Sequence, residues 1–321
     1  MGAIRLAVWV FSLATVMPGA EGAYGQTYPT KPVRVITPSF GGTADFVARA
    51  IAQGLTANLG QQVIVDNRNN DVTPIDIVMK SAPDGYALLL YGTLVWLLPY
   101  MRDDVRYDPL KDLAPITLTN KAPGVLVSYP AFPAKSVKEL IALAKAKPGV
   151  FNYATTATGN ATHIAGELFK SMAGVNIVRV NYRATATAVS ELIAGQVQLM
   201  FGTAGTVTPH LKTGRLTALA VTSAQPSTLF PGLPTVAESG LPGYEAVQMN
   251  GMYAPVKTPA ALIDRLNREI VRVLNQPDTK ETFLNLRVEP VGSSPQEFTA
   301  TMGSEMTRLG KVIKAAGIRD E

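Results

Sequence analysis

Two short stretches of small and hydroxyl-bearing residues have the composition of a binding site for an anion. The first stretch covers residues 39–45, and a helical pattern of apolar residues begins where it ends. Backbone N–H groups in the first turn of a helix have no partner within the helix, and the helix dipole adds partial positive charge there. A carboxylate or a phosphate is therefore a natural ligand for such a loop. The alternative is an ordinary strand-to-helix turn with Asp45 as a helix-start residue.

The second stretch repeats this arrangement further along the chain. Residues 156–162 are mainly threonine, glycine and asparagine, and they separate a predicted strand at 151–155 from a predicted helix at 163–172. His163 begins this helix, so a local hydrogen bond at the helix start is the alternative to a ligand contact. The pair of loops predicts a ligand that bridges two helix N-termini, with an anionic group at each end.

Several kinds of site are excluded or disfavoured by the residues present. The first loop has neither a Gly-Lys-Ser/Thr ending nor a Gly-x-Gly-x-x-Gly pattern, so it is not a P-loop or a dinucleotide turn. The chain has two histidines, His163 and His210, no cysteine, and no Gly-x-Ser-x-Gly or His-Glu-x-x-His motif. We therefore predict a binding protein without catalytic residues, cofactor or metal. An enzyme that uses carboxylates alone stays open as an alternative.

Composition and charge agree with a folded, anion-binding protein. The chain has 321 residues, 47% hydrophobic and 17% charged, which suits a globular protein of two domains. Its net charge of +5 favours anionic ligands. Lysine and arginine are scattered along the chain, which argues against a nucleic-acid surface.

The N-terminus has the features of a secretory signal peptide. Arg5 is followed by an apolar run at residues 6–16, which is shorter than the about 20 residues of a membrane span. Small residues follow, and residues 1–25 are the predicted signal. An uncleaved membrane anchor is the alternative.

The elements that position the two loops alternate between strand and helix, which predicts an α/β fold with mainly parallel sheets. A capping box at Ser294 and Glu297 begins the last helix, and Thr258 with Pro259 is expected to begin the one before it. We expect strands at 33–37, 62–66, 87–91, 125–127, 151–155, 178–182, 196–201, 217–222 and 246–250. Helices are expected at 46–55, 74–80, 136–147, 163–172 and 187–194, followed by a helical C-terminal region from 258 onward.

Several segments together resemble the tripartite tricarboxylate transporter substrate-binding proteins, also called Bug or TctC-like periplasmic receptors. The resemblance covers nearly the whole chain after the signal peptide. It rests on an opening with Tyr28, Pro29, Lys31 and Pro32, the loop at 38–45, the turn at 83–85, and the segments 107–116, 156–167, 194–201 and 231–244.

This resemblance implies a periplasmic-binding-protein type II fold, with two α/β domains joined by two crossover strands around a hinged cleft. Domain 1 would comprise residues 26–124 and 246–321, and domain 2 would comprise residues 125–245. The implied function is that of a periplasmic receptor, a monomer, that captures a di- or tricarboxylate and delivers it to subunits of a membrane transporter. A ligand sensor for a signalling partner is the alternative.

Departures from the family pattern bear on the ligand. The segment 69–74 lacks the glycines of a family ligand loop, Arg183 stands where the family often has lysine, and Gly202 stands where it often has aspartate. The stretch after Thr93 is expected to be an apolar loop. Trp96 in it is either a core residue or a flat wall for an aromatic ligand. These departures favour an aromatic dicarboxylate such as terephthalate.

The predicted ligand-binding residues come from these loops and strand ends. They are Ser39, Phe40, Gly41, Gly42, Thr43, Ala44, Asp45, Thr93, Trp96, Thr156, Ala157, Thr158, Asn160, Thr162, His163, Arg183, Gly202 and Thr203. For Arg183, a solvent-facing side chain is the alternative to pairing with a ligand carboxylate.

Overall fold

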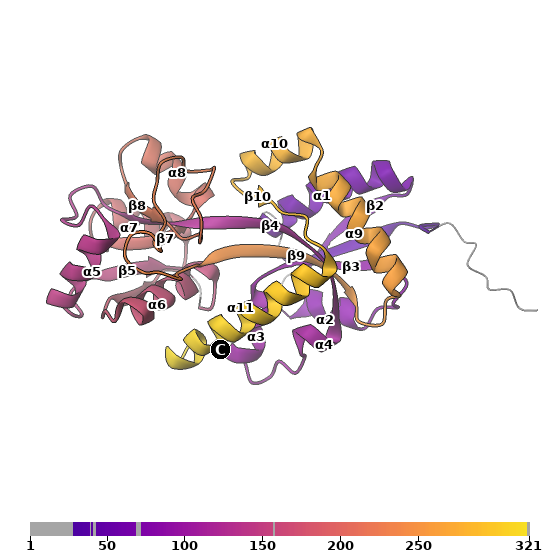
Figure 1. The fold of residues 1–321 in the computed structure, drawn as a ribbon, viewed down its shortest axis with the longest axis horizontal. Coiled ribbons are helices and arrows are strands. Elements are labelled where there is room, and N and C mark those ends of the chain that lie inside the picture. Colours follow the sequence, from indigo (N-terminus) through magenta and orange to yellow (C-terminus); the bar gives the residue numbers. More distant parts are fainter. Residues whose placement is uncertain (1–27, 39, 41–42, 69–71, 157, 320–321) are drawn as a thin grey trace, which may run out of the picture.

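The computed structural model describes residues 28–38, 40, 43–68, 72–156 and 158–319 (Figure 1). The predicted signal peptide lies outside these residues. Ten strands occur within them: β1 (Val33–Thr37), β2 (Val63–Asn67), β3 (Ala87–Gly92), β4 (Leu113–Ser128), β5 (Asn152–Thr155), β6 (Val178–Asn181), β7 (Leu199–Thr203), β8 (Thr217–Val221), β9 (Val247–Pro255) and β10 (Glu289–Pro290).

Eleven helices accompany the strands in the same described ranges. They are α1 (Thr43–Leu59), α2 (Thr73–Met79), α3 (Leu94–Met101), α4 (Pro109–Asp112), α5 (Val137–Ala146), α6 (Ala161–Ala173), α7 (Thr185–Ile193), α8 (Ala204–Lys212), α9 (Ala260–Leu274), α10 (Pro277–Asn285) and α11 (Pro295–Ala315). The predicted α/β fold with parallel strands is confirmed.

One long strand, β4, divides the strands into two sheets. The strands follow the path β2-β1-β3-β9-β4-β7-β5-β6, and β8 and β10 pair with β4 beside it. Residues 113–123 of β4 pair with β9, and residues 124–128 pair with β7. We call β2-β1-β3-β9-β4 the first sheet and β4-β7-β5-β6, with β8, the second sheet. β4 and β9 run lengthwise between the two groups of elements (Figure 1).

The pleat of the first sheet sends alternate side chains to two different layers of helices. In β3, Leu88 and Leu90 pack with α1 and α9, whereas Leu89 and Tyr91 belong to the larger core that includes α2, α3 and α11. Both faces of the parallel strands are therefore covered, which explains why β3 is apolar at every position from 87 to 91.

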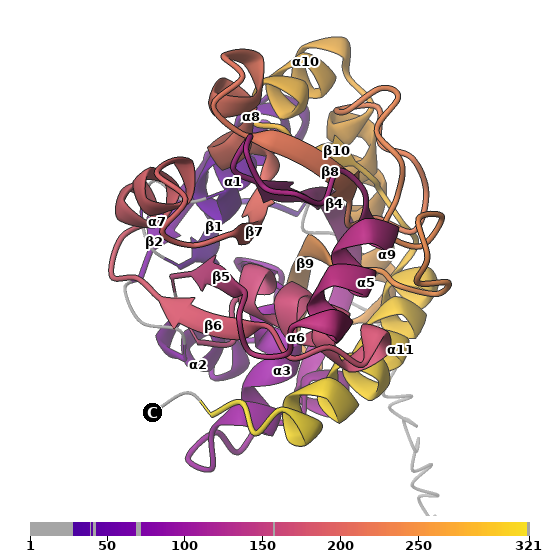
Figure 2. The ribbon, with the colours of Figure 1, turned by 90° about the vertical axis from the view of Figure 1, so that its left-hand side faces the viewer.

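The second sheet is covered in the same way, with α5 and α6 on one face and α7 and α8 on the other (Figure 2). Its β5, β6 and β7 are parallel to one another, and β4 is antiparallel to β7. Because parallel strands end at the same edge, the loops after β5 and β7 lie at one edge of this sheet. That edge faces β9 and α3.

Thr222 joins the two crossover segments to each other. Its buried hydroxyl accepts a hydrogen bond from the Gly124 N–H at 2.8 Å and donates to the Ala246 carbonyl at 2.6 Å. The Thr222 backbone also bonds to both residues. Chain segments 122–124 and 246–248 are thus held together beside the edge described above.

Several predicted elements need correction. The stretch after Thr93 is a helix, α3, rather than a loop. α3 is buried on almost every side, and its residues are therefore apolar all round. Without an amphipathic stripe, the sequence did not indicate a helix here. α9 has Pro259 as its N-cap, and the Thr258 hydroxyl donates to the Pro255 carbonyl instead. α8 was not predicted. The Ser294 capping box is confirmed.

No helix within the described residues combines the length and the apolar character that crossing a bilayer requires. The domain boundaries at residues 124/125 and 245/246 stay a prediction.

Candidate functional site

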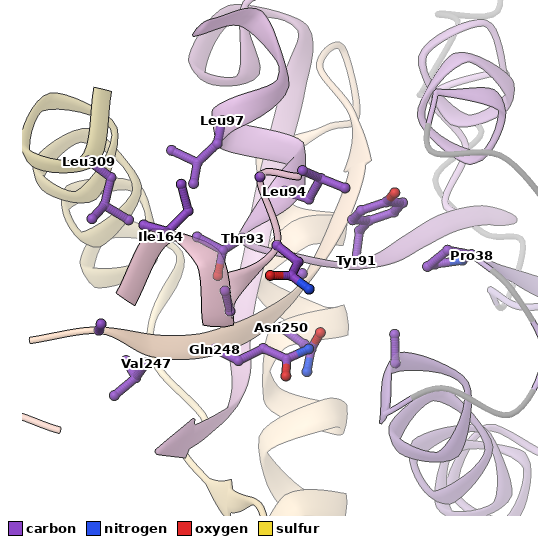
Figure 3. Close-up of a pocket in the computed structure, with 16 residues that line it drawn as sticks. Pro38, Tyr91, Thr93, Leu94, Leu97, Ile164, Val247, Gln248, Asn250 and Leu309 are labelled. Atoms are coloured by element: carbon purple, nitrogen blue, oxygen red, sulfur yellow. The ribbon is translucent and has the colours of Figure 1, made fainter. Parts of the chain in front are cut away.

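A cavity of about 230 Å³ lies where the two sheets meet. It is bounded by the first turn of α1, the end of β3 and start of α3, the start of α6, β9, and α11 (Figure 3). These elements come from five distant parts of the sequence. The topology brings them together because β3 and β9 are neighbours in the first sheet and α6 follows β5 in the second.

Three helices begin at this cavity. Ala44 in the first turn of α1, Leu94 at the start of α3, and Ala161 at the start of α6 all line it. Each helix start contributes N–H groups without an intrahelical partner and a partial positive charge. The cavity is therefore a favourable place for a negatively charged group.

The start of α6 is held in a defined geometry by its own side chains. The Asn160 carboxamide oxygen accepts hydrogen bonds from the His163 N–H and the Thr162 hydroxyl, both at 2.8 Å. The Gly159 N–H donates to His163 Nδ1 at 3.0 Å. Gly159 has φ of 74°, and a Cβ there would lie 2.5 Å from the sulfur of Met101 in α3. Only glycine fits this turn, which brings α6 against α3.

A second, narrower cavity adjoins the first and shares Ala161, Ala246 and Gln248 with it. Gly202 and Thr203, at the end of β7, lie on its far side. Thr203 is the N-cap of α8, and its hydroxyl is 2.9 Å from the Thr206 hydroxyl. A fourth helix start therefore faces the same region.

Two amides of β9 are among the polar side chains that line the first cavity. Gln248 lines both cavities, and its side chain makes no hydrogen bond to another described residue. Asn250 is fully buried, and its Nδ2 donates to Asn120 Oδ1 at 3.2 Å. Asn250 Oδ1 and Asn120 Nδ2 have no partner among the described residues. Rotation of both carboxamides by half a turn would exchange their oxygen and nitrogen atoms and keep the hydrogen bond between them. Asn250 can therefore offer a ligand either an acceptor or a donor.

None of the described residues that line the two cavities carries a charged side chain. The nearby Asp45 is fully buried, and its carboxylate accepts from Asn67 Nδ2 and pairs with Arg49, both at 2.9 Å. Asp45 therefore stabilises the start of α1. An anion in the cavity meets no opposing carboxylate on the lining and must be held by peptide N–H, hydroxyl and amide groups.

The structure places some of the predicted ligand-binding residues at these cavities. Ala44, Thr93 and Asn160 line the first cavity, and Thr162, Gly202 and Thr203 line the second. The Thr93 hydroxyl is already engaged, because it donates to the Met249 carbonyl and accepts from the Met249 N–H. Ser39, Gly41, Gly42 and Ala157 lie outside the described residues.

Other predicted residues do not line either cavity. Arg183 and Phe40 are exposed, and the Phe40 ring lies beneath the Arg49 guanidinium. The Thr156 hydroxyl is 3.4 Å from Asn160 Nδ2, so it belongs to the α6 turn. Thr43 begins α1 beside Ala44 without lining the cavity.

Trp96 is a core residue rather than a cavity wall. Its ring is fully buried, its Nε1 donates to the Tyr253 hydroxyl at 2.6 Å, and it packs edge-on against Phe298 of α11. Burial raises the pKa of the Tyr253 hydroxyl well above its usual value. The stacking wall expected for an aromatic ligand is therefore corrected, because α3 turns this side chain away from the cavity and into the core.

Thr158 and His163 face a different, basic pocket of about 300 Å³. Lys170, Arg179 and Arg319 contribute cations to it. Arg179 donates to the hydroxyls of Thr155 at 2.8 Å and Thr158 at 3.3 Å, so it stabilises the loop before α6 from the side of the basic pocket. Burial, helped by the charge of Arg179, lowers the pKa of His163 to about 4. His163 is therefore neutral, and the local hydrogen bond is its observed role.

The apolar part of the first cavity and both amides of β9 were not predicted from the sequence. Leu94, Leu97, Ile164, Val247 and Leu309 come from four elements, and each alone resembles an ordinary core residue. Gln248 and Asn250 are polar positions in an otherwise apolar strand. That pattern is the one signal in the sequence that could have pointed to them. No group of three or more histidine, aspartate or glutamate side chains able to hold a metal occurs among the described residues.

Comparisons with known proteins agree on one family. A family model described as "Tripartite tricarboxylate transporter family receptor" matches residues 47–318. The chain is 34% identical over 299 residues to protein BugT of Bordetella pertussis, which covers 92% of each chain.

Solved structures give the same result. The chain is 32% identical to R. palustris Rpa4515, solved with adipate, with a TM-score of 0.76 over 92% of this chain and 100% of that one. Its identity to the periplasmic binding protein BugD is 29%, with a TM-score of 0.73 over 92% and 100%. The predicted periplasmic-binding-protein fold and the resemblance to the Bug and TctC-like receptors are confirmed.

Proposed function

The chain belongs to the tripartite tricarboxylate transporter receptor family, and from this premise we propose that it captures a small carboxylate in the first cavity. The observation that carries the proposal is the convergence of the starts of α1, α3 and α6 on a cavity without charged lining residues in the described chain. Helix starts in a partly dehydrated cavity stabilise an anion without an ionised side chain.

The proposed role is that of a periplasmic receptor and not of an enzyme. Residues 1–25 would direct its export, and it would act as a monomer that delivers its ligand to the membrane subunits of a tripartite tricarboxylate-type transporter. The periplasmic location of the relative BugD and the family assignment support this role. A ligand sensor for a signalling partner is the second role that the same binding event could serve.

Binding would draw together two domains, residues 26–124 with 246–321 and residues 125–245. With these boundaries the cavity would have walls from both domains, since α1 and α3 would belong to the first and α6 to the second. Closure around a ligand at such a junction is a common response in two-domain binding proteins. With the same boundaries, the chain would pass between the domains in the two segments that Thr222 joins.

The chemical class of the ligand follows from the relatives and the cavity. Rpa4515 is solved with adipate, so a carboxylate is the starting point. Trp96 no longer supports terephthalate, the aromatic dicarboxylate favoured by the sequence, but the aliphatic residues that line the cavity would still offer a ring an apolar contact.

A thermal-shift and calorimetric screen tests the proposal. Purified protein from residue 26 onward would be titrated with aliphatic and aromatic mono-, di- and tricarboxylates and with uncharged amides of the same acids. We expect at least one acid, and not its amide, to raise the melting temperature, because a ligand that binds only the folded state stabilises it. If no acid binds, the proposal is wrong.

Substitution of Ala161 locates the binding event. Ala161 is the first residue of α6 and lines both cavities, so a larger side chain there fills the space of the ligand. We expect Ala161→Leu to weaken the binding of that acid by about tenfold or more, which corresponds to about 1.4 kcal/mol. Ala260, the exposed first residue of α9, is the matched control. Equal affinity in Ala161→Leu and Ala260→Leu would place the site elsewhere.

A further inference from the structure

The first cavity is polar on one side and apolar on the other. From this division we infer that its ligand is a monocarboxylate with a compact apolar body, which lies between α3, α6 and α11. The inference rests on the proposed function, because it assumes that the cavity binds an acid. It narrows the class of ligand, since it excludes a second carboxylate at the far end of the molecule.

The apolar side consists of aliphatic side chains from four elements. They are Leu97 of α3, Ile164 of α6, Val247 of β9 and Leu309 of α11. All four side chains are nearly buried, from 2% exposed for Leu97 to 7% for Val247. Leu97, Ile164, Val247 and Leu309 lie together on one side of the cavity (Figure 3).

The polar side lies nearer to the start of α1. Tyr91, Gln248 and Asn250 lie there, on the side of Pro38 and away from Leu309 (Figure 3). Asn160 and the start of α6 also contribute to the lining. A carboxylate on this side gains hydrogen bonds from amides and from helix starts.

A charged group on the apolar side would be left without a partner. Arg308 precedes Leu309 in α11, but its guanidinium is already bound. It pairs with Glu305 at 2.7 Å and donates to the Glu245 carbonyl at 2.6 Å. The Thr93 hydroxyl is bonded to the backbone of Met249. A second carboxylate placed among Leu97, Ile164, Val247 and Leu309 would lose its hydration, and these side chains offer it no hydrogen bond.

An apolar group on the same side gains stability instead. Each buried methylene contributes about 0.8 kcal/mol relative to exposure in water. The cavity volume of about 230 Å³ lies below the range of about 300–1,000 Å³ that is usual for drug-sized ligands. A single ring or a short aliphatic chain fits these limits.

Matched pairs of acids test the inference on the unaltered protein. Hexanoate and adipate share six carbons and differ at one end, as do benzoate and terephthalate with one ring. We expect the monocarboxylate of at least one pair to bind about tenfold or more tightly than its dicarboxylate in calorimetric titrations. Equal or tighter binding of both dicarboxylates would overturn the inference and leave the carboxylate receptor intact. Binding of dicarboxylates or tricarboxylates alone would have the same meaning. If no acid of any class binds, the proposed function itself fails.

A substitution on the apolar side supplies an independent test. Leu309→Asn keeps a similar volume but places a polar amide where the body of the ligand would lie. With the acid that binds the unaltered protein as probe, we expect about a tenfold or greater loss of affinity, and little change for acetate, whose body is a single methyl group. Leu284→Asn, at an exposed position of α10, is the matched control. An unchanged affinity in folded Leu309→Asn would overturn the inference, and the paired titrations decide the matter if this variant does not fold.

Discussion

At the scale of single residues, Trp96 and Tyr253 form a buried pair in which Trp96 Nε1 lies 2.6 Å from the Tyr253 hydroxyl oxygen. Trp96→Phe removes the donor and leaves the buried hydroxyl without it, so we expect a loss of about 1–3 kcal/mol in the free energy of unfolding. The ratio of affinities for aromatic and aliphatic acids should stay the same, since the ring does not line the cavity. Urea denaturation and calorimetric titration measure the two quantities.

The Tyr253→Phe variant provides the control for this pair. If the hydrogen bond is the main loss, the double variant should cost less than the sum of the two single variants. A selective loss of aromatic ligands in Trp96→Phe would instead restore the stacking role expected from the sequence.

At the scale of elements, the turn that begins α6 depends on a neutral histidine. His163 Nδ1 can accept the Gly159 N–H only while it is unprotonated. Its pKa of about 4 in the folded protein lies below the usual 6.5, so the unfolded chain binds this proton more readily. The contribution of His163 to stability is therefore present above pH 6.5 and is lost as the pH falls toward about 4.

Removal of this titration should make stability less dependent on pH. Asparagine can accept the same Gly159 N–H without binding a proton, so we expect His163→Asn to lose less unfolding free energy than the original protein between pH 6.5 and 4.5. Urea denaturation at several pH values measures the difference. Parallel curves for the two proteins would contradict this prediction.

Helices and strands could be predicted from the sequence where a clear apolar pattern or a capping motif marks them. β1, β3 and α11 could be located because alternation, apolar runs or a capping box marked them. α3 could not, because a helix buried on most sides has no polar stripe to reveal its period. α3 supplies both a helix start and Leu97 to the cavity lining, so neither contribution could be predicted without this helix.

Other site residues depend on tertiary contacts that no local pattern records. Gln248 and Asn250 reach the cavity because β9 lies beside β3, a pairing between residues more than 150 positions apart. Arg179 reaches the loop before α6 from a neighbouring strand. The loop and the start of α6 could be located from the sequence, but which residues of the loop face the first cavity followed only from the packing.

At the scale of the whole molecule, Thr222 joins the two crossover segments through one hydroxyl. Thr222→Val keeps the shape and removes the hydroxyl, leaving the Gly124 N–H and the Ala246 carbonyl without this partner. We expect a loss of about 1–3 kcal/mol in the free energy of unfolding, measured by urea denaturation. Thr213→Val is the control, because the Thr213 hydroxyl also bonds to the backbone but is exposed. Equal losses in the two variants would show that Thr222 has no special part in joining the segments.

The absence of charged side chains on the described cavity lining has a consequence for how such a receptor diversifies. In the proposed function, main-chain N–H groups at helix starts would hold the acidic group, and these N–H groups persist through almost any exchange of side chains. Leu94, Leu97, Ile164, Val247 and Leu309 could then vary without loss of that contact. A gene duplicate could therefore acquire a new solute through a few aliphatic exchanges while it keeps a preference for acids.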